Sequence, residues 1–120
     1  MNAAHGRYLL RLARSVEERT AAYRLRFEVF NLELREGLDT AYTTGQDVDE
    51  FDSICDHLIV EDHPSGRVIG TYRLQSGTTA AANGGYYSER EFDFRPYEPL
   101  RGSMVELGRA CIHREHRSTE

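Results

Sequence analysis

One stretch of helical periodicity lies early in the chain, between runs of β-forming residues, and it constrains the fold most. Ser15 and Glu18 have the Ser-x-x-Glu spacing of a helix capping box. After them, apolar residues recur at spacings of three and four along one helix face: Ala22, Leu25, Val29 and Leu32. The pattern predicts a helix that runs to about Arg35 and ends near Gly37. A helix among β-type runs predicts an α+β chain.

Four runs have the composition of β-strands, and they cover residues 8–13, 57–61, 67–75 and 104–113. The two central runs are separated by His63-Pro64-Ser65-Gly66, whose Pro and Gly favour a turn, so we expect an antiparallel hairpin. The last run carries Gly108 in its middle, which predicts a bulge. We expect this run to lie in the middle of the sheet and to part from its neighbour, which would open a slot.

The segments between these elements lack periodicity. Residues 36–53 gather Gly and acidic residues and predict a long ordered or mobile loop, of the kind that often carries function. Residues 76–85 are small and predict a flexible segment. Ser88 and Glu91 have capping-box spacing before a short helical or irregular segment.

The composition fits one folded domain, residues 1–120, and excludes several classes of function. A chain of this length buries about two-thirds of its unfolded surface, which is enough for one core. The formal net charge of −5 argues against a protein that depends on attraction to nucleic-acid phosphates. All 15 basic residues are Arg, so any anion contact would come from planar guanidinium groups.

Cysteine usage and hydropathy indicate a cytoplasmic protein. The two cysteines, Cys55 and Cys111, are too few for a disulfide-stapled scaffold, and we expect both to be packed and reduced. The N-terminus lacks the apolar core of a signal peptide, and no apolar run approaches the roughly 20 residues that span a bilayer.

Four short motifs, in this order and at these separations, resemble a known pattern. They are Arg26-x-x-Val29-Phe30, Asp49-x-x-Asp52, Gly70-x-x-Arg73-Leu74 and Glu106-x-x-Arg109. Together they resemble the shared core of two groups of GNAT fold: the acyl-homoserine-lactone synthases, and the bacterial ornithine N-acyltransferases with the hemolysin-like acyltransferases. The resemblance covers nearly the whole chain. It implies a mixed, mostly antiparallel sheet flanked by helices.

Longer stretches distinguish the two groups. Residues 51–58, 69–74, 84–87 and 106–111 look like the ornithine-type enzymes. The signal synthases usually carry a Trp a few residues after the Val29-Phe30 pair, whereas this sequence contains no Trp and has Leu34 and Arg35 in that region. The ornithine group is therefore the preferred resemblance.

This resemblance implies transfer of a 3-hydroxyacyl chain from acyl carrier protein to the α-amino group of ornithine, which gives a lyso-ornithine lipid. Acyl carrier protein and ornithine are then the expected partners, with no bound cofactor or metal. Three alternatives stay open: another amino acid as acceptor, a signal synthase that uses S-adenosylmethionine, and a non-catalytic module that binds acyl carrier protein or a partner chain. A lipid product is compatible with peripheral contact at the inner membrane.

Glu106 and Arg109 are the candidate catalytic residues. Aminolysis of a thioester needs an uncharged amine, and a carboxylate can take the proton. In a regular strand Glu106 and Arg109 would point to opposite faces, but a bulge near Gly108 would bring them to one side. The alternative is a structural ion pair of Glu106 with Arg73 or Arg109. Arg73 and Arg109 would orient the carboxylate or bind a substrate carboxylate in a bidentate fork.

The other candidate substrate contacts come from the first helix and the acidic loop. By resemblance, Asp49 and Asp52 belong to the amino-substrate side and would attract the cationic amines of ornithine, although a solvated acidic loop is the simpler interpretation. Arg26 and Phe30 lie four apart on one helix face and would close the acyl or amine pocket, with Phe30 as plain core the alternative.

In the GNAT enzymes that the chain resembles, the phosphopantetheine arm is held by backbone N–H groups. These groups follow the strand that corresponds to residues 104–113 of this chain. Residues 113–120 resemble the start of that loop, so we expect His113, Arg114 and Arg117 to contact the acyl carrier. The helix and strands that would follow are absent, which predicts a form truncated after the fourth strand. A metal cluster of Cys111, His113 and His116 is disfavoured because a fourth ligand is lacking.

Overall fold

The computed structural model describes residues 2–117 and shows an antiparallel sheet whose five strands follow one another in chain order. The strands are β1 (Asn2–His5), β2 (Tyr8–Leu12), β3 (Asp56–Asp62), β4 (Arg67–Ser76) and β5 (Val105–Ile112). The α-helices are α1 (Val16–Arg26), α2 (Ala41–Thr44) and α3 (Gly77–Ala82). The chain also has one π-helical segment, η1 (Phe27–Glu33), and three 3₁₀-helical segments, η2 (Tyr87–Arg90), η3 (Arg95–Ser103) and η4 (Arg114–His116), within the described residues. The predicted α+β fold is confirmed.

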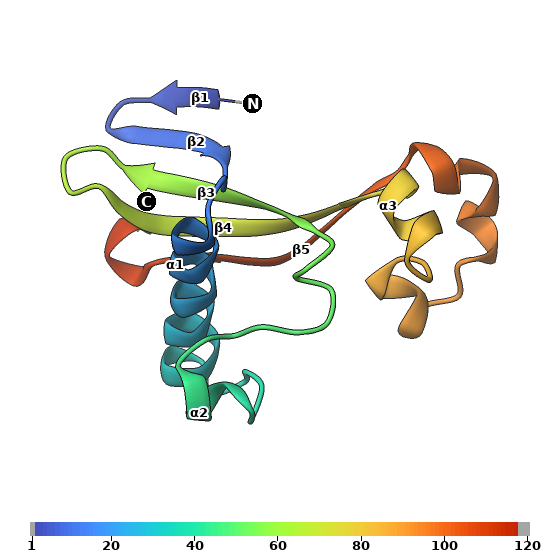
Figure 1. The fold of residues 1–120 in the computed structure, drawn as a ribbon, viewed down its shortest axis with the longest axis horizontal. Coiled ribbons are helices and arrows are strands. Elements are labelled where there is room, and N and C mark those ends of the chain that lie inside the picture. The colour runs from blue at the N-terminus through green and yellow to red at the C-terminus, as the bar shows by residue number, and fades with distance from the viewer. Residues whose placement is uncertain (1, 118–120) are drawn as a thin grey trace.

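Two long excursions leave the sheet at the same end. The first holds α1, α2 and the acidic loop (residues 36–53) and joins β2 to β3. The second, residues 77–104, joins β4 to β5 and is called the distal lobe here. Leu12 pairs with Leu58, and Ser76 pairs with Val105. Both excursions therefore leave the sheet and return to it at the same end of the strands. In Figure 1, α1 lies against the sheet and the distal lobe projects beyond the strand ends.

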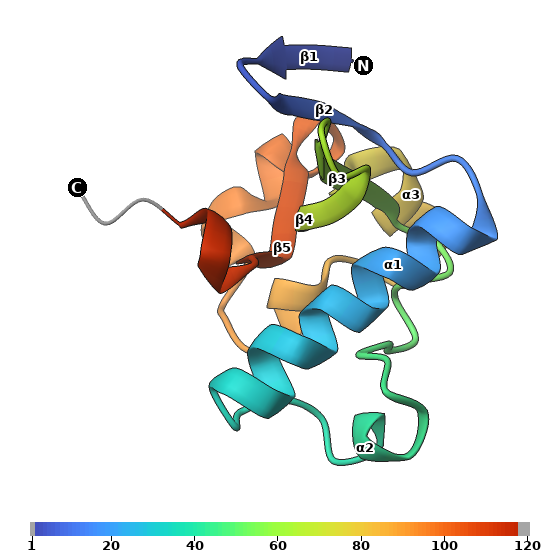
Figure 2. The same ribbon diagram turned by 90° about the vertical axis from the view of Figure 1, so that its left-hand side faces the viewer.

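Helix α1 forms as the sequence predicts. The Ser15 hydroxyl accepts a hydrogen bond from the Glu18 backbone N–H at 3.1 Å, which satisfies one donor of the first turn. Leu25 and Val29 are buried against Cys111 of β5, with Phe30 and Val68 packed beside them. Figure 2 shows the helix crossing one face of the sheet. This contact is the main apolar core.

The prediction that Leu32 belongs to the buried helix face is wrong. The chain continues from α1 into the π-helical segment η1, and the Leu34 N–H donates to the Val29 carbonyl, five residues back. The wider turn shifts the buried positions, so that Asn31 is buried and Leu32 is 57% exposed. The Asn31 amide donates to the Leu38 carbonyl at 2.8 Å, and Gly37 lies so close that a side chain there would overlap Asn31.

The predicted hairpin is confirmed, and the sheet has one more strand than predicted. In the β3–β4 turn, Gly66 has φ +73° and donates its N–H to the Asp62 carbonyl at 2.7 Å. A second hairpin joins β1 to β2 through Gly6, whose φ of +59° suits the first position of a two-residue turn. The short segment 2–5 has no β-branched residue, so its composition did not identify it as a strand.

In the part of the chain that the structure describes, strand β5 lies at the edge of the sheet, whereas we expected it in the middle. Within residues 2–117 its paired neighbour is β4, and no described segment follows β5 to pair with its other side. The bulge predicted near Gly108 is present, because the β4–β5 register shifts between Thr71 and Arg73. We expected a slot where β5 parts from its neighbouring strand. The structure has a bulge in the β4–β5 pair instead.

Two local predictions for the distal lobe are also wrong. The segment 76–85 contains the ordered helix α3, whose first turn is capped by the Ser76 hydroxyl. The side-chain cap that was expected from Ser88 and Glu91 is replaced by a contact of Glu89, whose carboxylate accepts the Tyr86 N–H at 2.7 Å. None of the helices within residues 2–117 has the length and apolar character to cross a membrane.

Gly77→Ala tests how α3 is held against the rest of the distal lobe. A Cβ at Gly77 would lie 2.7 Å from the Arg101 carbonyl oxygen and 2.8 Å from that of Gly102. Because backbone atoms cannot move aside as a side chain can, we expect the free energy of unfolding to fall by about 1–3 kcal/mol. Urea unfolding measures the change. The control is Gly102→Ala, where a Cβ meets nothing within 4 Å, and an equal loss in both variants would contradict the prediction.

Candidate active site

The bulge in β5 places Glu106 and Arg109 on the same side of the sheet, as predicted. Gly108 pairs with Arg73, and Cys111 pairs with Thr71. Two residues of β5, Arg109 and Ala110, therefore lie opposite one residue of β4, Tyr72. Arg109 has φ +48°, a left-handed conformation that is uncommon for a residue other than Gly. The local strain turns the Arg109 side chain toward the cavity that Glu106 also lines.

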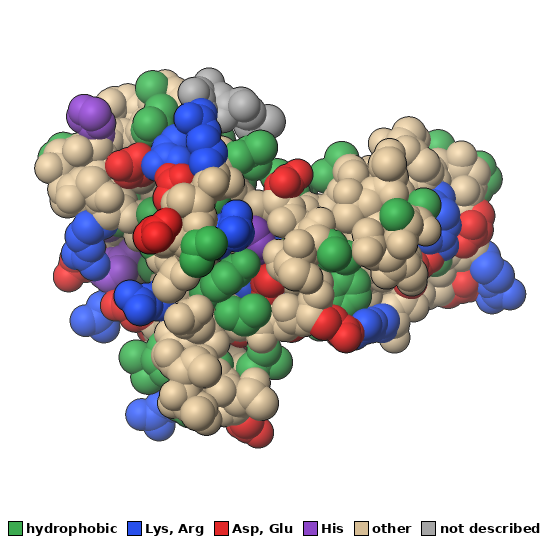
Figure 3. All heavy atoms as spheres, in the orientation of Figure 1, with side chains coloured by type: hydrophobic (Ala, Val, Ile, Leu, Met, Phe, Trp, Pro, Cys, Tyr) green, Lys and Arg blue, Asp and Glu red, His purple; other side chains and the backbone are tan. Residues whose placement is uncertain are grey.

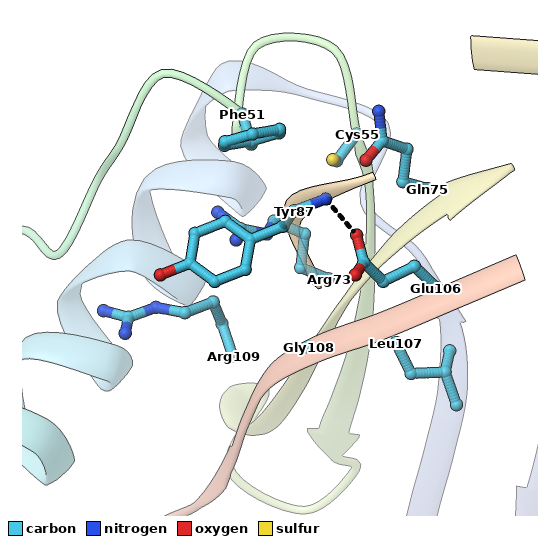
Figure 4. A pocket seen from close by; sticks show the side chains of 9 residues that line it. All are labelled: Phe51, Cys55, Arg73, Gln75, Tyr87, Glu106, Leu107, Gly108 and Arg109. Carbon is cyan, nitrogen blue, oxygen red and sulfur yellow. Dashed lines mark hydrogen bonds between the residues drawn. The ribbon is translucent and has the colours of Figure 1, made fainter. Parts of the chain in front are cut away.

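The Glu106 carboxylate is held by two backbone N–H groups of the distal lobe. Its oxygens accept hydrogen bonds from the Tyr87 and Ser88 N–H groups, each at 2.8 Å. In Figure 4 the carboxylate projects from β5 toward the start of η2, where these donors lie. The alternative interpretation, an ion pair of Glu106 with Arg73 or Arg109, does not describe the contacts made within residues 2–117, because both carboxylate oxygens are bonded to backbone donors.

A small cavity of about 80 Å³ lies beside the Glu106 carboxylate. Strands β4 and β5 form its floor, and the two excursions form its walls (Figure 4). Phe51 of the acidic loop and Tyr87 of the distal lobe meet edge to face, with ring centroids 5.3 Å apart. The full set of lining residues is Phe51, Cys55, Arg73, Gln75, Tyr87, Glu106, Leu107, Gly108 and Arg109.

Arg73 is the fixed positive charge of this cavity. Its guanidinium donates to the Asp49 carboxylate at 2.6 Å and lies 5.6 Å and 5.5 Å from the centroids of the Phe51 and Tyr87 rings. Burial alone would lower the pKa of Arg73, but the hydrogen bond and charge of Asp49, with the charge of Asp52, raise it above its ordinary value. The side chain therefore remains charged and fixed.

Arg26 joins helix α1 to the acidic loop through a buried ion-pair network. Its guanidinium donates to both carboxylate oxygens of Asp52, at 2.9 Å and 2.8 Å, and its Nε lies 3.0 Å from the Asp47 carboxylate. All three side chains are at most 1% exposed. Burial tends to raise the pKa of Asp52, but its hydrogen bonds and the charge of Arg26 outweigh this and lower it.

Arg109 is anchored at its far end. Its guanidinium pairs with the buried Asp47 carboxylate and lies over the Phe30 ring, with the guanidinium carbon 4.7 Å from the ring centroid. Phe30 thus supports Arg109 and packs against the core cluster. The Arg109 Nε is buried and has no hydrogen-bond partner among residues 2–117, so one donor of this side chain is unused.

The two predicted acidic contacts do not line the cavity beside Glu106 but border another, more open pocket. Asp49 and Asp52 line a hollow of about 370 Å³ on the outer side of the acidic loop, together with Tyr23 of α1. Cys55 borders both this pocket and the cavity beside Glu106. Arg26 does not line either pocket. The structure thus brings Glu106, Arg109 and Arg73 together directly, and Asp49 through its bond to Arg73.

His57 lies behind the acidic loop as a buried, neutral group. Its Nε2 is 2.9 Å from the Asp52 carbonyl oxygen and 3.3 Å from the Tyr23 hydroxyl, and its Nδ1 has no partner within the described chain. Burial lowers the pKa of His57, and this effect outweighs the Asp52 carbonyl and the Asp52 charge, which raise it. His57 therefore supports the Asp52 backbone.

The two cysteines have the properties of packed thiols. Burial raises the pKa of Cys55 to about 11 and that of Cys111 to about 12. Both thiols remain protonated near neutral pH, and neither is in a disulfide. Within residues 2–117, no three His, Cys, Asp or Glu side chains are grouped as metal ligands would be.

The residues expected to contact the acyl carrier lie together at the end of β5, away from the cavity. His113 is buried and accepts the Glu115 N–H at 3.2 Å, and Arg114 is exposed. Arg117 makes a bidentate pair with Glu33 at 2.6 Å and 2.9 Å, so an anion bound there would compete with that carboxylate. The end of the predicted loop, residues 118–120, lies outside the described residues.

Among the lining residues that were not predicted from the sequence as site residues are Phe51, Gln75 and Tyr87. Phe51 and Tyr87 belong to segments without periodicity, so nothing in their spacing placed them side by side. Gln75 had a usable signal, because it lies two residues after Arg73 on the same predicted strand and must face the same side.

The bulged strand, the carboxylate beside it and the sheet with its crossing helix define a class of protein. Residues 25–120 match the family described as Acetyltransferase (GNAT) domain. This match covers more than half of the chain, and the chain belongs to the GNAT family of acyltransferases. The predicted family and its mostly antiparallel sheet are confirmed.

Within this family, the chain is similar to ornithine acyltransferases. It is 37% identical over 123 residues to the L-ornithine N(alpha)-acyltransferase of Rhodobacter capsulatus. The matched region covers 98% of this chain and 48% of that relative. The corresponding enzyme of Agrobacterium fabrum is 39% identical over 116 residues, covering 90% of this chain and 40% of the relative. The chain thus spans less than half the length of these relatives.

A solved structure has a similar fold. The crystal structure of the AHL synthase LasI superposes with a TM-score of 0.58 at 17% identity, covering 93% of this chain and 56% of that chain. At this identity the likeness concerns the fold alone.

Arg26→Met tests the buried network. The change removes the shared partner of two buried carboxylates while keeping an apolar side chain of similar length. We expect the free energy of unfolding to fall by about 3–5 kcal/mol, because a buried charge without its partner is strongly destabilising. Urea unfolding is the measurement. Glu50→Gln is the control, since the Glu50–Arg90 pair is exposed and such pairs contribute about 0–1 kcal/mol. Similar losses in both variants would contradict a special role for the buried pair.

His57 gives the protein an acid-sensitive stability. Because the folded state lowers the pKa of His57 below its unfolded value, the unfolded state binds the proton first as pH falls. The stability from neutral His57 is complete above about pH 6.5 and declines below it, by at most about 1.4 kcal/mol per pH unit. His57→Gln should flatten the decline between pH 7 and pH 5, as measured by urea unfolding at each pH. An unchanged slope would show that other groups cause it.

Proposed function

We propose that the chain carries the acceptor side of an active site that transfers a fatty acyl group from acyl carrier protein to the α-amino group of ornithine. The observation that carries the proposal is the Glu106 carboxylate, fixed by two backbone N–H groups at a small cavity between Arg73 and Arg109. Similarity to L-ornithine N(alpha)-acyltransferases supports ornithine as the acceptor. The thioester donor follows from the resemblance to those enzymes.

The proposed chemistry is direct aminolysis. The amine nitrogen attacks the thioester carbonyl carbon, a C–N bond forms, and the C–S bond breaks to release the carrier thiol. One proton leaves the nitrogen and is accepted by the Glu106 carboxylate, and an equivalent proton restores the leaving thiolate to a thiol. The attack requires the uncharged amine, so the ammonium form of ornithine first releases a proton.

The remaining site residues have supporting roles in this proposal. The unused Arg109 Nε donor is available to the carboxylate of the amino acid, while Asp47 and Phe30 fix the rest of that side chain. Asp49 lines the outer pocket and is proposed to attract the second, cationic amine of ornithine, while the buried Asp52 holds the turn that carries Asp49. Arg26 supports the substrate contacts through Asp52. His113, Arg114 and Arg117 are proposed to meet the acyl carrier.

Two features of the surface bear on partners. On the face seen in Figure 3, basic and acidic side chains lie interspersed, without a field of one sign. Such a surface does not suit blanket binding to nucleic acid. Peripheral contact with the inner membrane and a cytoplasmic location are proposals that follow from the lipid product.

Glu106→Gln in the full-length protein tests the proposal. The amide cannot accept the proton, so we expect kcat for thiol release from acyl carrier protein with ornithine to fall by about 10²–10⁴-fold. Glu98→Gln is the matched control, because Glu98 lies exposed on η3, where it pairs with Arg101.

The same assay separates the alternatives. Thiol release that depends on S-adenosylmethionine and not on ornithine would identify a signal synthase. No release with either amine, from a protein that still binds acyl carrier protein, would favour the non-catalytic module. Full activity of Glu106→Gln would refute the role assigned to Glu106.

A further inference from the structure

Gln75 carries a buried hydrogen-bond acceptor that nothing described in the protein satisfies. Its side chain is 2% exposed, and its Oε1 has no hydrogen-bond partner among residues 2–117. Its Nε2 donates to the Gly85 carbonyl oxygen at 3.4 Å, which determines which end of the amide is the oxygen. A buried carbonyl oxygen without a donor is unfavourable, and folded proteins keep few of them. Gln75 also lines the cavity beside Glu106.

Gln75 and Glu106 are direct cross-strand partners. The β4–β5 register pairs Gln75 with Glu106, so their side chains leave the sheet on the same face, with Cβ atoms about 4.5–5.5 Å apart. Figure 4 shows the Gln75 amide beside Cys55 and the Glu106 carboxylate directed toward the Tyr87 N–H. Among the nine lining residues, these two are the ones whose side chains carry a carbonyl or carboxylate oxygen. The cavity thus offers two acceptors, side by side, to one occupant.

Two adjacent acceptors select a group that has at least two hydrogens on one atom. A hydroxyl has one hydrogen to donate, whereas a primary amine has two and its ammonium form has three. The cavity of about 80 Å³ exceeds the roughly 30 Å³ that one water occupies in the liquid, so an amino group and the carbon that bears it fit. The nearby charge of Arg73 is balanced by Asp49, which leaves the two acceptors to bind the donor.

We infer that Gln75 is a specificity-determining residue that binds the acceptor amine together with Glu106 and selects a primary amine. This inference rests on the proposed function. One N–H of the amine is directed to the Glu106 carboxylate and a second to the Gln75 Oε1. When both hydrogens of the uncharged amine are bound, its lone pair points away from Gln75 and Glu106. There the lone pair can attack the thioester. A tertiary amine cannot use both acceptors.

The test compares two ligands and two proteins by titration calorimetry on the full-length protein. The ligands are L-ornithine and Nα,Nα-dimethyl-L-ornithine, whose protonated α-nitrogen has a single N–H. The proteins are the wild type and Gln75→Met, which keeps the length of the side chain and removes the acceptor. We expect Gln75→Met to weaken ornithine binding by about tenfold and to leave binding of the dimethyl ligand within about twofold.

Gln75→Glu separates two roles of Gln75: its side-chain oxygen as a hydrogen-bond acceptor in the cavity, and its amide nitrogen as a donor to the Gly85 carbonyl. This variant keeps an acceptor oxygen toward the cavity and cannot donate to the Gly85 carbonyl, so ornithine binding should be retained. If Gln75 only holds Gly85, both variants lose binding alike, and the inference fails. It also fails if Gln75→Met weakens both ligands equally, or leaves ornithine binding unchanged because the cavity holds only water.

The outcomes also separate this inference from the proposed function. If the wild type binds ornithine but the ligands respond alike to Gln75→Met, ornithine remains the acceptor and only the role of Gln75 is lost. If the wild type does not bind ornithine at millimolar concentration, the proposed acceptor is wrong and the inference falls with it. Unfolding curves for each variant confirm that the sheet is intact, because an altered midpoint would mark a change in packing.

Discussion

The buried pairing of Arg26 with Asp52 and Asp47 connects the helix to the loop that builds the site. Neither carboxylate is accessible to water, so each depends on a guanidinium for its charge to be tolerated. The Asp52 carboxylate also accepts the Asp49 N–H at 2.7 Å, which fixes the turn that carries Phe51. One buried cation on α1 thereby determines where a wall of the cavity lies.

The same network extends to the residues that face the cavity. Asp47 pairs with Arg109 as well as with Arg26, and Asp49 pairs with Arg73. Both cavity arginines are therefore held by carboxylates from the acidic loop. An arginine cannot lose its proton under ordinary conditions, so the two positive charges beside Glu106 are constant. The clustered acidic residues Asp47, Asp49 and Asp52 thus act largely by fixing the positions of arginine side chains.

The parts of the fold that were predicted correctly are those in which local chemistry and tertiary packing agree. The capped start of α1, the β3–β4 turn and the bulge near Gly108 each follow from residues that favour one backbone geometry. Leu32 was misassigned because η1 departs from the α-helical period, and α3 was missed because small residues are compatible with a loop or a helix. β1 was missed because its pairing with β2, and not its composition, makes it a strand.

The candidate site shows the same division. Glu106, Arg109 and Arg73 were found because each lies on a strand in a family motif. Phe51 and Tyr87 come from the two irregular excursions, and only the folded sheet brings them together. Gln75 was overlooked because an amide in a strand usually has a structural partner, and its unmet oxygen is visible only when every neighbouring donor is known.

The meander topology has a consequence for how such a cavity forms. The β1–β2 and β3–β4 hairpins close through short turns, so their formation costs little chain entropy. By contrast, pairing β2 with β3 and β4 with β5 closes the two long excursions, and non-local closures of this kind are slow steps. Glu106, Phe51 and Tyr87 come together only when both closures are complete. Partly folded chains therefore contain hairpins but no binding site, and ligand binding reports on the final stage of assembly.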